Sequence, residues 1–251
     1  MENKISERTT LPFELVYSDG EPMESAWHTY QFPLLRELIF LTMEEQGRDD
    51  FYVGGNMFVY YSYEQAADVA RGEPYLRGPD VFWVGGIEHR RHSRRAWVSW
   101  EEGGRLPDVI VELLAPSTAE IDRTLKRDLY AQVFRTAEYY LYEPETLKLE
   151  GLRLEGTVYQ PMVPNESGQF WSDQLGVFLG VWHGTVGQCS NQDWVRLFRP
   201  DGNLVATYAE RAEAALQRAD FWHAEATKRR ADAAEAELAR LRALLKDRGL
   251  S

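Results

Sequence analysis

The chain has almost no cysteine. Among its 251 residues only Cys189 carries a thiol, so one chain can form neither an internal disulfide nor an all-cysteine metal site. The opening residues, MENKISERTT, lack the apolar core of a signal peptide, and no uninterrupted apolar run is long enough to span a bilayer. These absences predict a soluble, cytoplasmic protein with no membrane partner.

Positive charge is also scarce. The chain has 28 Lys and Arg against 40 Asp and Glu, a formal net charge of -12. Such a chain does not attract polyanions through its overall field, which counts against nonspecific binding of nucleic acid. One basic stretch is an exception and contains Arg90, Arg91, Arg94 and Arg95. It is either a solvated loop or a face that contacts nucleic acid, and its composition leaves both interpretations open.

Several motifs with a known chemistry are missing. The sequence contains no GxSxG nucleophile elbow, no Walker phosphate loop and no dinucleotide fingerprint. Its histidines show neither metalloprotease nor zinc-finger spacing, so we expect structural or surface roles for them. The glycine pairs at 54–55 and 85–86 are expected to form turns.

The residues that are present predict a packed α/β (α+β) body. Hydrophobic content is 44% and aromatic content 13%. Helical spacing of leucines predicts a helix over 32–43 with Pro33 in its first turn, and 51–61 is expected to form a strand or a glycine-turned hairpin. Further strands are predicted at 81–84, 109–114, 138–142, 147–154, 158–163, 177–181 and 193–198. We therefore expect a mixed β-sheet flanked by helices.

The composition changes near residue 207. Residues 1–206 are expected to form the body, and 207–251, rich in Ala, Glu and Arg, a long helical tail. Apolar and small residues recur there at alternating spacings of three and four, at Ala224, Thr227, Ala231, Ala234, Leu238, Leu241 and Leu245. This heptad pattern is typical of a helix that packs on another helix, although a solvent-exposed tail helix would also accommodate it.

An acidic residue interrupts the apolar strand 109–114. Glu112 shares a strand face with Ile110 and Leu114, and a buried carboxylate is costly unless a cation satisfies it. Asp80 opens the strand at 81–84. If these two strands form a hairpin, the start of one lies beside the end of the other. Asp80 and Glu112 would then converge as ligands for a hard divalent cation.

A helix is predicted after this strand, from a capping box formed by Ser117 and Glu120 to about residue 134. Asp122, Lys126 and Tyr130 repeat every four residues and so share one face of that helix. If this face is directed toward the strand end, Lys126 can stabilise charge at a scissile phosphate. The alternative is an ordinary Asp122–Lys126 pair on the solvent side, and spacing alone does not decide between the two.

The motifs GPDVFWV, PDVIVELLAPST, D-R-x-x-K-x-x-x-Y and EPETLKLEGLRL together resemble the Uma-type putative restriction endonucleases of the PD-(D/E)xK nuclease superfamily. The resemblance implies a restriction-endonuclease-like core with additional β structure. It matches Asp80 to the first acid, Glu112 to the second and Lys126 to the lysine. The superfamily pattern places lysine two residues after the second acid, where this chain has Leu114. Asp108, in a second Pro-Asp pair, is an alternative for the acid, but we expect it to be a turn residue at the entry to the strand.

Two function classes follow. The first is a DNA endonuclease that uses Mg²⁺ or Mn²⁺ held by Asp80 and Glu112, with Lys126 assisting hydrolysis and Asp122 and Tyr130 supporting it. The second is a catalytically inactive relative that binds nucleic acid or acts in assembly through its helical tail. A homodimer is expected for the first class, because cutting two strands favours two active sites and the C-terminal helix offers a seam for pairing.

Overall fold

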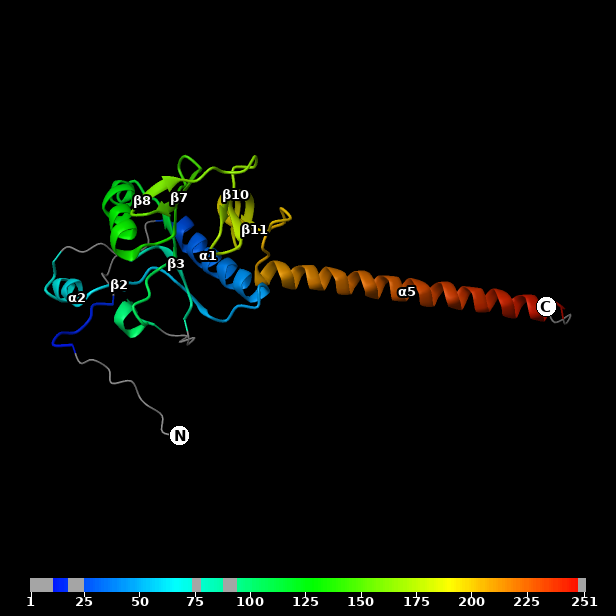
Figure 1. Cartoon of the computed structure of the whole chain (residues 1–251). Helices are drawn as coiled ribbons and strands as arrows, with labels where there is room; N and C mark the ends of the chain where they lie inside the picture. Colours follow the sequence, from blue (N-terminus) through cyan, green and yellow to red (C-terminus); the bar gives the residue numbers. More distant parts are fainter. Residues whose placement is uncertain (1–10, 18–24, 74–77, 88–93, 248–251) are drawn as a thin grey trace, which may run out of the picture. The chain divides into compact units, whose positions relative to one another are not determined.

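The computed structural model describes residues 11–17, 25–73, 78–87 and 94–247 (Figure 1). The chain divides into two compact units, Met1–Val205 and Ala206–Ser251. None of the helices described combines the length and the apolar character needed to cross a membrane.

A six-stranded sheet is the centre of the first unit. Its strands, in spatial order, are β1 (Phe51–Gly54), β3 (Val81–Gly85), β5 (Val109–Leu113), β6 (Glu138–Glu143), β7 (Lys148–Glu155) and β8 (Val158–Pro161). The β5–β6 pair is parallel, whereas the other pairs are antiparallel. The mixed sheet, its flanking helices and the additional β structure confirm the predicted fold class.

Helix α1 (Ala26–Glu45) packs its leucines against one face of this sheet. It begins earlier than the sequence pattern predicted, because Ser25 caps it by accepting a hydrogen bond from the backbone N–H of His28 at 3.4 Å. Pro33 therefore lies inside the helix and not in its first turn, which removes one backbone hydrogen bond.

A three-stranded sheet packs on the other side of α1. It has the order β11 (Cys189–Phe198), β10 (Val177–Val186) and β9 (Phe170–Ser172). The buried amide of Gln31 pairs with the outer edge of β11: its Nε2 donates to Val195 O at 3.0 Å, and its Oε1 accepts from Val195 N at 2.8 Å. Gln31, on a helix, thereby satisfies both backbone groups that Val195 presents at the edge of the sheet.

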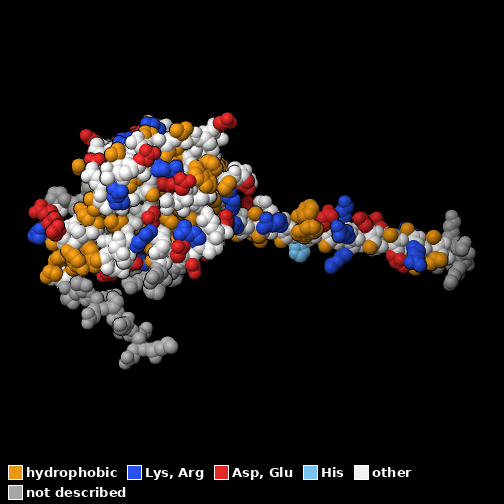
Figure 2. All heavy atoms as spheres, in the orientation of Figure 1, with side chains coloured by type: hydrophobic (Ala, Val, Ile, Leu, Met, Phe, Trp, Pro, Cys, Tyr) orange, Lys and Arg blue, Asp and Glu red, His pale blue; other side chains and the backbone are white. Residues whose placement is uncertain are grey.

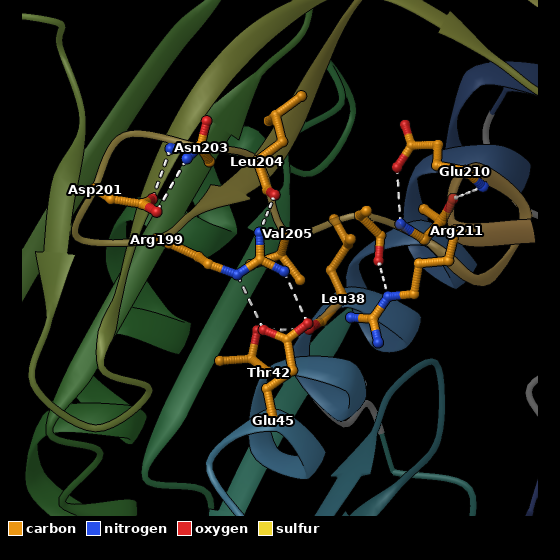
Figure 3. Close-up of polar contacts among 12 residues, drawn as sticks. Leu38, Thr42, Glu45, Arg199, Asp201, Asn203, Leu204, Val205, Glu210 and Arg211 are labelled. Atoms are coloured by element: carbon orange, nitrogen blue, oxygen red, sulfur yellow. Dashed lines mark hydrogen bonds and ion pairs between the residues drawn. The ribbon is translucent and has the colours of Figure 1, made fainter. Parts of the chain in front are cut away.

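A second polar contact ties the end of α1 to the turn that follows β11 (Figure 3). The Arg199 guanidinium makes a two-pronged ion pair with Glu45, with nitrogen–oxygen distances of 2.8 and 3.1 Å, and also donates to Leu204 O. The turn itself is closed by Asp201, which accepts hydrogen bonds from the backbone and side-chain nitrogens of Asn203.

The stretch 51–61 departs from the prediction. It is not a hairpin: β1 joins the large sheet, whereas β2 (Val59–Tyr60) pairs in parallel with β4 (Trp97–Val98). Gly55 is required for close packing and not for a turn, since a Cβ there would lie 2.0 Å from Asp80 O. After β2 the chain forms α2 (Tyr63–Ala70), and after β4 the 3₁₀ turn η1 (Ser99–Glu101).

The helical segment after β5 alternates α and π turns. It comprises α3 (Ala119–Ile121), η2 (Asp122–Lys126), α4 (Arg127–Leu129) and η3 (Tyr130–Phe134). The N-cap of α3 is Thr118, whose side chain makes no capping hydrogen bond, and not Ser117 as the predicted capping box required. The segment ends at Arg135, whose φ of 59° is left-handed.

The second unit is dominated by α5 (Tyr208–Asp247). It starts with a reciprocal capping box in which Glu210 N donates to Thr207 Oγ1 at 3.1 Å and Thr207 N donates to Glu210 Oε2 at 2.8 Å (Figure 3). The long helix expected for the tail is therefore present.

Candidate active site

Asp80 and Glu112 converge where β3 begins and β5 ends. The antiparallel register pairs Val81 with Val111, which brings Asp80 beside Glu112. The Asp80 backbone N–H donates to Glu112 Oε2 at 3.2 Å, and the Leu113 N–H donates to Asp80 Oδ2 at 2.7 Å. Each acid is thus held by the backbone of the strand that carries the other.

Glu112 is fully buried, with no exposed surface. Burial raises the pKa of its carboxyl well above the usual 4.5, and the negative charges of Asp80 and Asp122 act in the same direction against the opposing charge of Lys126. Burial likewise raises the pKa of Asp80, although Lys126 and the Leu113 N–H partly offset it. The two carboxyls lie in an environment that disfavours two uncompensated negative charges.

Lys126 supplies a compensating positive charge. Its Nζ lies 3.1 Å from Glu112 Oε1 and 2.7 Å from Asp122 Oδ1, and its side chain is 11% exposed. Burial by itself would lower its pKa, but the charges of Glu112, Asp122 and Asp80 outweigh that effect and raise it. Lys126 therefore stays protonated and is directed into the site, away from the solvent-side position that spacing had left open.

Tyr130 completes the set from the next turn. Its hydroxyl donates to Glu112 Oε1 at 2.8 Å, so this oxygen receives both Tyr130 and Lys126. Asp122 is held at its backbone, where its carbonyl accepts from the Tyr139 hydroxyl at 2.9 Å. The three residues spaced by four along the helix thus line one buried polar cluster over β5.

Two carboxylates that meet at a strand end fit a hard divalent cation, which prefers oxygen ligands. Within the described ranges, no group of three or more His, Cys, Asp or Glu residues is arranged to hold a metal ion. Magnesium does not require such a cage, because it usually keeps several waters and binds through one or two carboxylates plus substrate phosphate. Asp80 and Glu112 would be the residues that hold it.

His28 is a residue at the site that sequence reasoning missed. Its Nε2 donates to Leu113 O at 3.2 Å, while its Nδ1 lies 2.7 Å from Ser25 Oγ. The N–H of Leu113 also donates to Asp80, so His28 ties α1 to the residue that follows Glu112 and holds Asp80. No local pattern could have signalled this contact, because it depends on how α1 docks against β5.

Asp108 has a structural position at the start of β5. Its Oδ2 accepts from Gly85 N at 2.8 Å and from Arg105 Nη2 at 3.0 Å. It fastens the far end of the β3–β5 hairpin, away from the end that carries Asp80 and Glu112.

The arginines of the basic stretch differ in their surroundings. Arg94 makes a buried two-pronged pair with Glu102 at 2.7 and 2.9 Å and stacks over Tyr52, a position that does not favour contact with nucleic acid. Arg95 is exposed and lies 3.8 Å from the centre of the Tyr17 ring. Arg90 and Arg91 lie outside the described residues.

The fold and the cluster define a class: a mixed α/β protein with two acids at adjoining strand ends and a lysine from the following helix. Residues 7–186 match the family described as Uma2, putative restriction endonuclease, and the chain belongs to that family.

Among solved structures, the chain is similar to a putative nuclease belonging to DUF820 from Anabaena variabilis, with 14% identity and a TM-score of 0.43. That match covers 63% of this chain and 81% of the other. A comparison with curated proteins finds no match.

Proposed function

We propose that this protein is a metal-dependent endonuclease that hydrolyses phosphodiester bonds in DNA. The observation that carries the proposal is the convergence of Asp80 and Glu112 with Lys126 in one buried cluster. Membership of a family described as putative restriction endonuclease supports it.

Asp80 and Glu112 would hold Mg²⁺ or Mn²⁺, which lowers the pKa of a bound water and offsets charge on a phosphoryl oxygen. The chain's own groups orient these acids. The Leu113 N–H fixes Asp80, while Tyr130 and the Asp80 N–H fix the two oxygens of Glu112. Lys126 keeps a positive charge at the strand end, where it can stabilise negative charge that develops on the scissile phosphate.

DNA is the proposed partner, and Arg95 stays a candidate for contacting its backbone. A homodimer is also proposed, since two chains would bring two sites to a duplex. A cytoplasmic location fits a DNA substrate and stays a prediction.

One observation favours a second function. Glu112 has no exposed surface and both of its oxygens already accept hydrogen bonds from the chain. A site closed in this way also suits a catalytically inactive relative that binds nucleic acid or acts in assembly.

Cleavage of a plasmid in the presence of Mg²⁺ or Mn²⁺ separates the two functions. We expect cleavage by the wild type and a loss of at least about a hundredfold in Glu112→Gln, because a metal ligand is removed. Lys126→Met is expected to lose activity as well.

Glu138→Gln is the matched control. Glu138 is a buried glutamate on the neighbouring strand β6, where it accepts from Asp173 N at 2.8 Å outside the cluster. It should keep activity per folded molecule. No cleavage by the wild type, together with no heat of Mn²⁺ binding in calorimetry, would overturn the proposal in favour of the second function.

A further inference from the structure

Helix α5 exposes almost its whole surface. Its 40 residues span about 60 Å. From Leu216 to Leu244 every side chain except that of Glu225 is exposed within the described part of the chain. Most helices in proteins are stabilised by packing one face against other residues. We therefore expect a helix of this length without a packed face to bind a partner.

One side of α5 has the pattern of a coiled-coil seam. Ala224, Ala231 and Leu238 take the a positions, and Thr227, Ala234 and Leu241 the d positions, of three successive heptads. Leu238 is 49% exposed and Leu241 is 51% exposed. The sequence continues the spacing at Leu245.

Charges flank this seam in a complementary order. Arg230 and Glu237 occupy g positions, and Glu235 and Arg242 occupy e positions. Figure 2 shows acidic and basic side chains interspersed along the helix. Among the described residues, neither Arg230 nor Glu235 nor Arg242 forms an ion pair within the chain, and Glu237 only approaches Arg240 at 3.9 Å on the exposed surface.

We propose that two copies of this chain associate through α5 as a parallel, in-register, two-stranded coiled coil. In that arrangement each g residue faces the e residue five positions further along the other copy. Arg230 then meets Glu235 of the second copy, and Glu237 meets Arg242. Twofold symmetry repeats both attractions.

The leucines decide the orientation. An antiparallel pair would also match opposite charges, with Lys228 facing Glu235. However, the antiparallel alignment in which the a and d residues of the two copies still face one another would place Leu238 against Thr227 and Leu241 against Ala224. The parallel register stacks leucine on leucine in successive layers, which buries more apolar surface. The alanine layers add little, so the dimer should depend on protein concentration.

Cysteine cross-linking of the full chain in a Cys189→Ser background tests this arrangement. A disulfide forms only when the two Cα atoms lie within about 4.4–6.8 Å. Ala224→Cys, Ala234→Cys and Leu241→Cys should each give a covalent dimer under mild oxidation. Ala236→Cys, on the outer f position, is the matched control and should not.

The outcomes are separable. Cross-linking in a mixture of the Ala224→Cys and Leu241→Cys proteins, but in neither alone, would show the antiparallel pair and overturn the proposed orientation. A concentration-independent monomer in light scattering, with seam cysteines no more reactive than the control, would overturn the dimer. Neither readout uses nuclease activity, so failure here is distinct from failure of the proposed active site.

A charge exchange tests the register. Glu235→Arg should raise the dimer dissociation constant about tenfold, because two attractions become repulsions. Adding Arg230→Glu to that variant should restore the dissociation constant of the wild type. Asp232→Arg makes the same charge change at a b position and should leave the constant within about twofold. If the double variant is as weak as Glu235→Arg alone, the register is wrong.

Discussion

At the scale of single residues, the cluster combines burial with opposing charge. Glu112 receives hydrogen bonds on both oxygens, but two of its neighbours, Asp80 and Asp122, are also acids. Lys126 supplies one positive charge against these three acids. In the absence of a further cation, uptake of a proton by the acid pair relieves the excess negative charge.

This balance predicts how stability depends on pH. The unfolded chain titrates Glu112 near 4.5, whereas the folded chain holds its pKa well above that value. Between these two values the folded protein binds more protons, so its free energy of unfolding falls as pH rises, by at most about 1.4 kcal/mol per pH unit for each such group. Asp80 acts in the same direction.

Urea unfolding with a chelator present, from about pH 5 to about pH 8, measures this dependence. Glu112→Gln cannot titrate and should have a flatter profile than the wild type. Acids with lowered pKa values, such as Asp50 and Glu143, titrate below this window in both states. Parallel profiles for the two proteins would contradict the prediction.

The acid pair could be predicted because antiparallel pairing of two neighbouring strands places the start of one beside the end of the other. Lys126 and Tyr130 could be placed on one helix face by their spacing, although only the docked helix shows that this face is directed inward. The His28–Leu113 contact joins residues 85 apart and the Arg94–Glu102 pair joins residues 8 apart, and both depend on tertiary packing that no local pattern signals. The catalytic roles of these residues stay predictions.

At the scale of elements, periodicity predicted the strands of the large sheet but neither β4 nor the pairing of β2 with it. Both strands are two residues long, and their parallel pairing is set by tertiary packing. The boundary of α1 was missed because Pro33 suggested a first turn, whereas Ser25 is the N-cap. Local signals give an element's type more reliably than its ends.

Gly55 packs directly against the backbone of Asp80, one of the two acids of the candidate active site. A side chain there would meet Asp80 O at 2.0 Å and the Phe32 ring at 2.6 Å. We expect Gly55→Ala to lower the free energy of unfolding by about 1–3 kcal/mol through overpacking. It should also reduce nuclease activity per folded molecule, because the displaced backbone carries Asp80.

Urea unfolding and plasmid cleavage measure the two effects. Gly156→Ala is a suitable control, since Gly156 has a left-handed φ of 61° and open space around it. Its strain should cost about 1–2 kcal/mol without loss of activity. Equal loss of activity in the two variants would show that Gly55 does not act through Asp80.

At the scale of the whole molecule, the chain combines a body and a helical unit that meet after Val205. The body has its own buried core, which includes Val205 at the end of the unit. A chain that ends at Val205 should therefore fold, with a thermal midpoint within about 5 °C of the full protein.

The same truncation should also change the oligomeric state in solution. If α5 carries the association, light scattering should show a monomer for the truncated chain at concentrations where the full chain is dimeric. A dimer of the truncated chain would move the interface to the body, and an unfolded truncated chain would show that the two units depend on each other.

The pairing of Gln31 with Val195 also bears on aggregation. The outer strand of a sheet normally offers unpaired N–H and C=O groups on which a strand from another molecule can add. On β11, the Gln31 amide occupies both groups of Val195 in the way a neighbouring strand would. A strand from another molecule therefore cannot pair with Val195 unless the Gln31 amide is first displaced, which hinders strand addition at this position of the β11 edge.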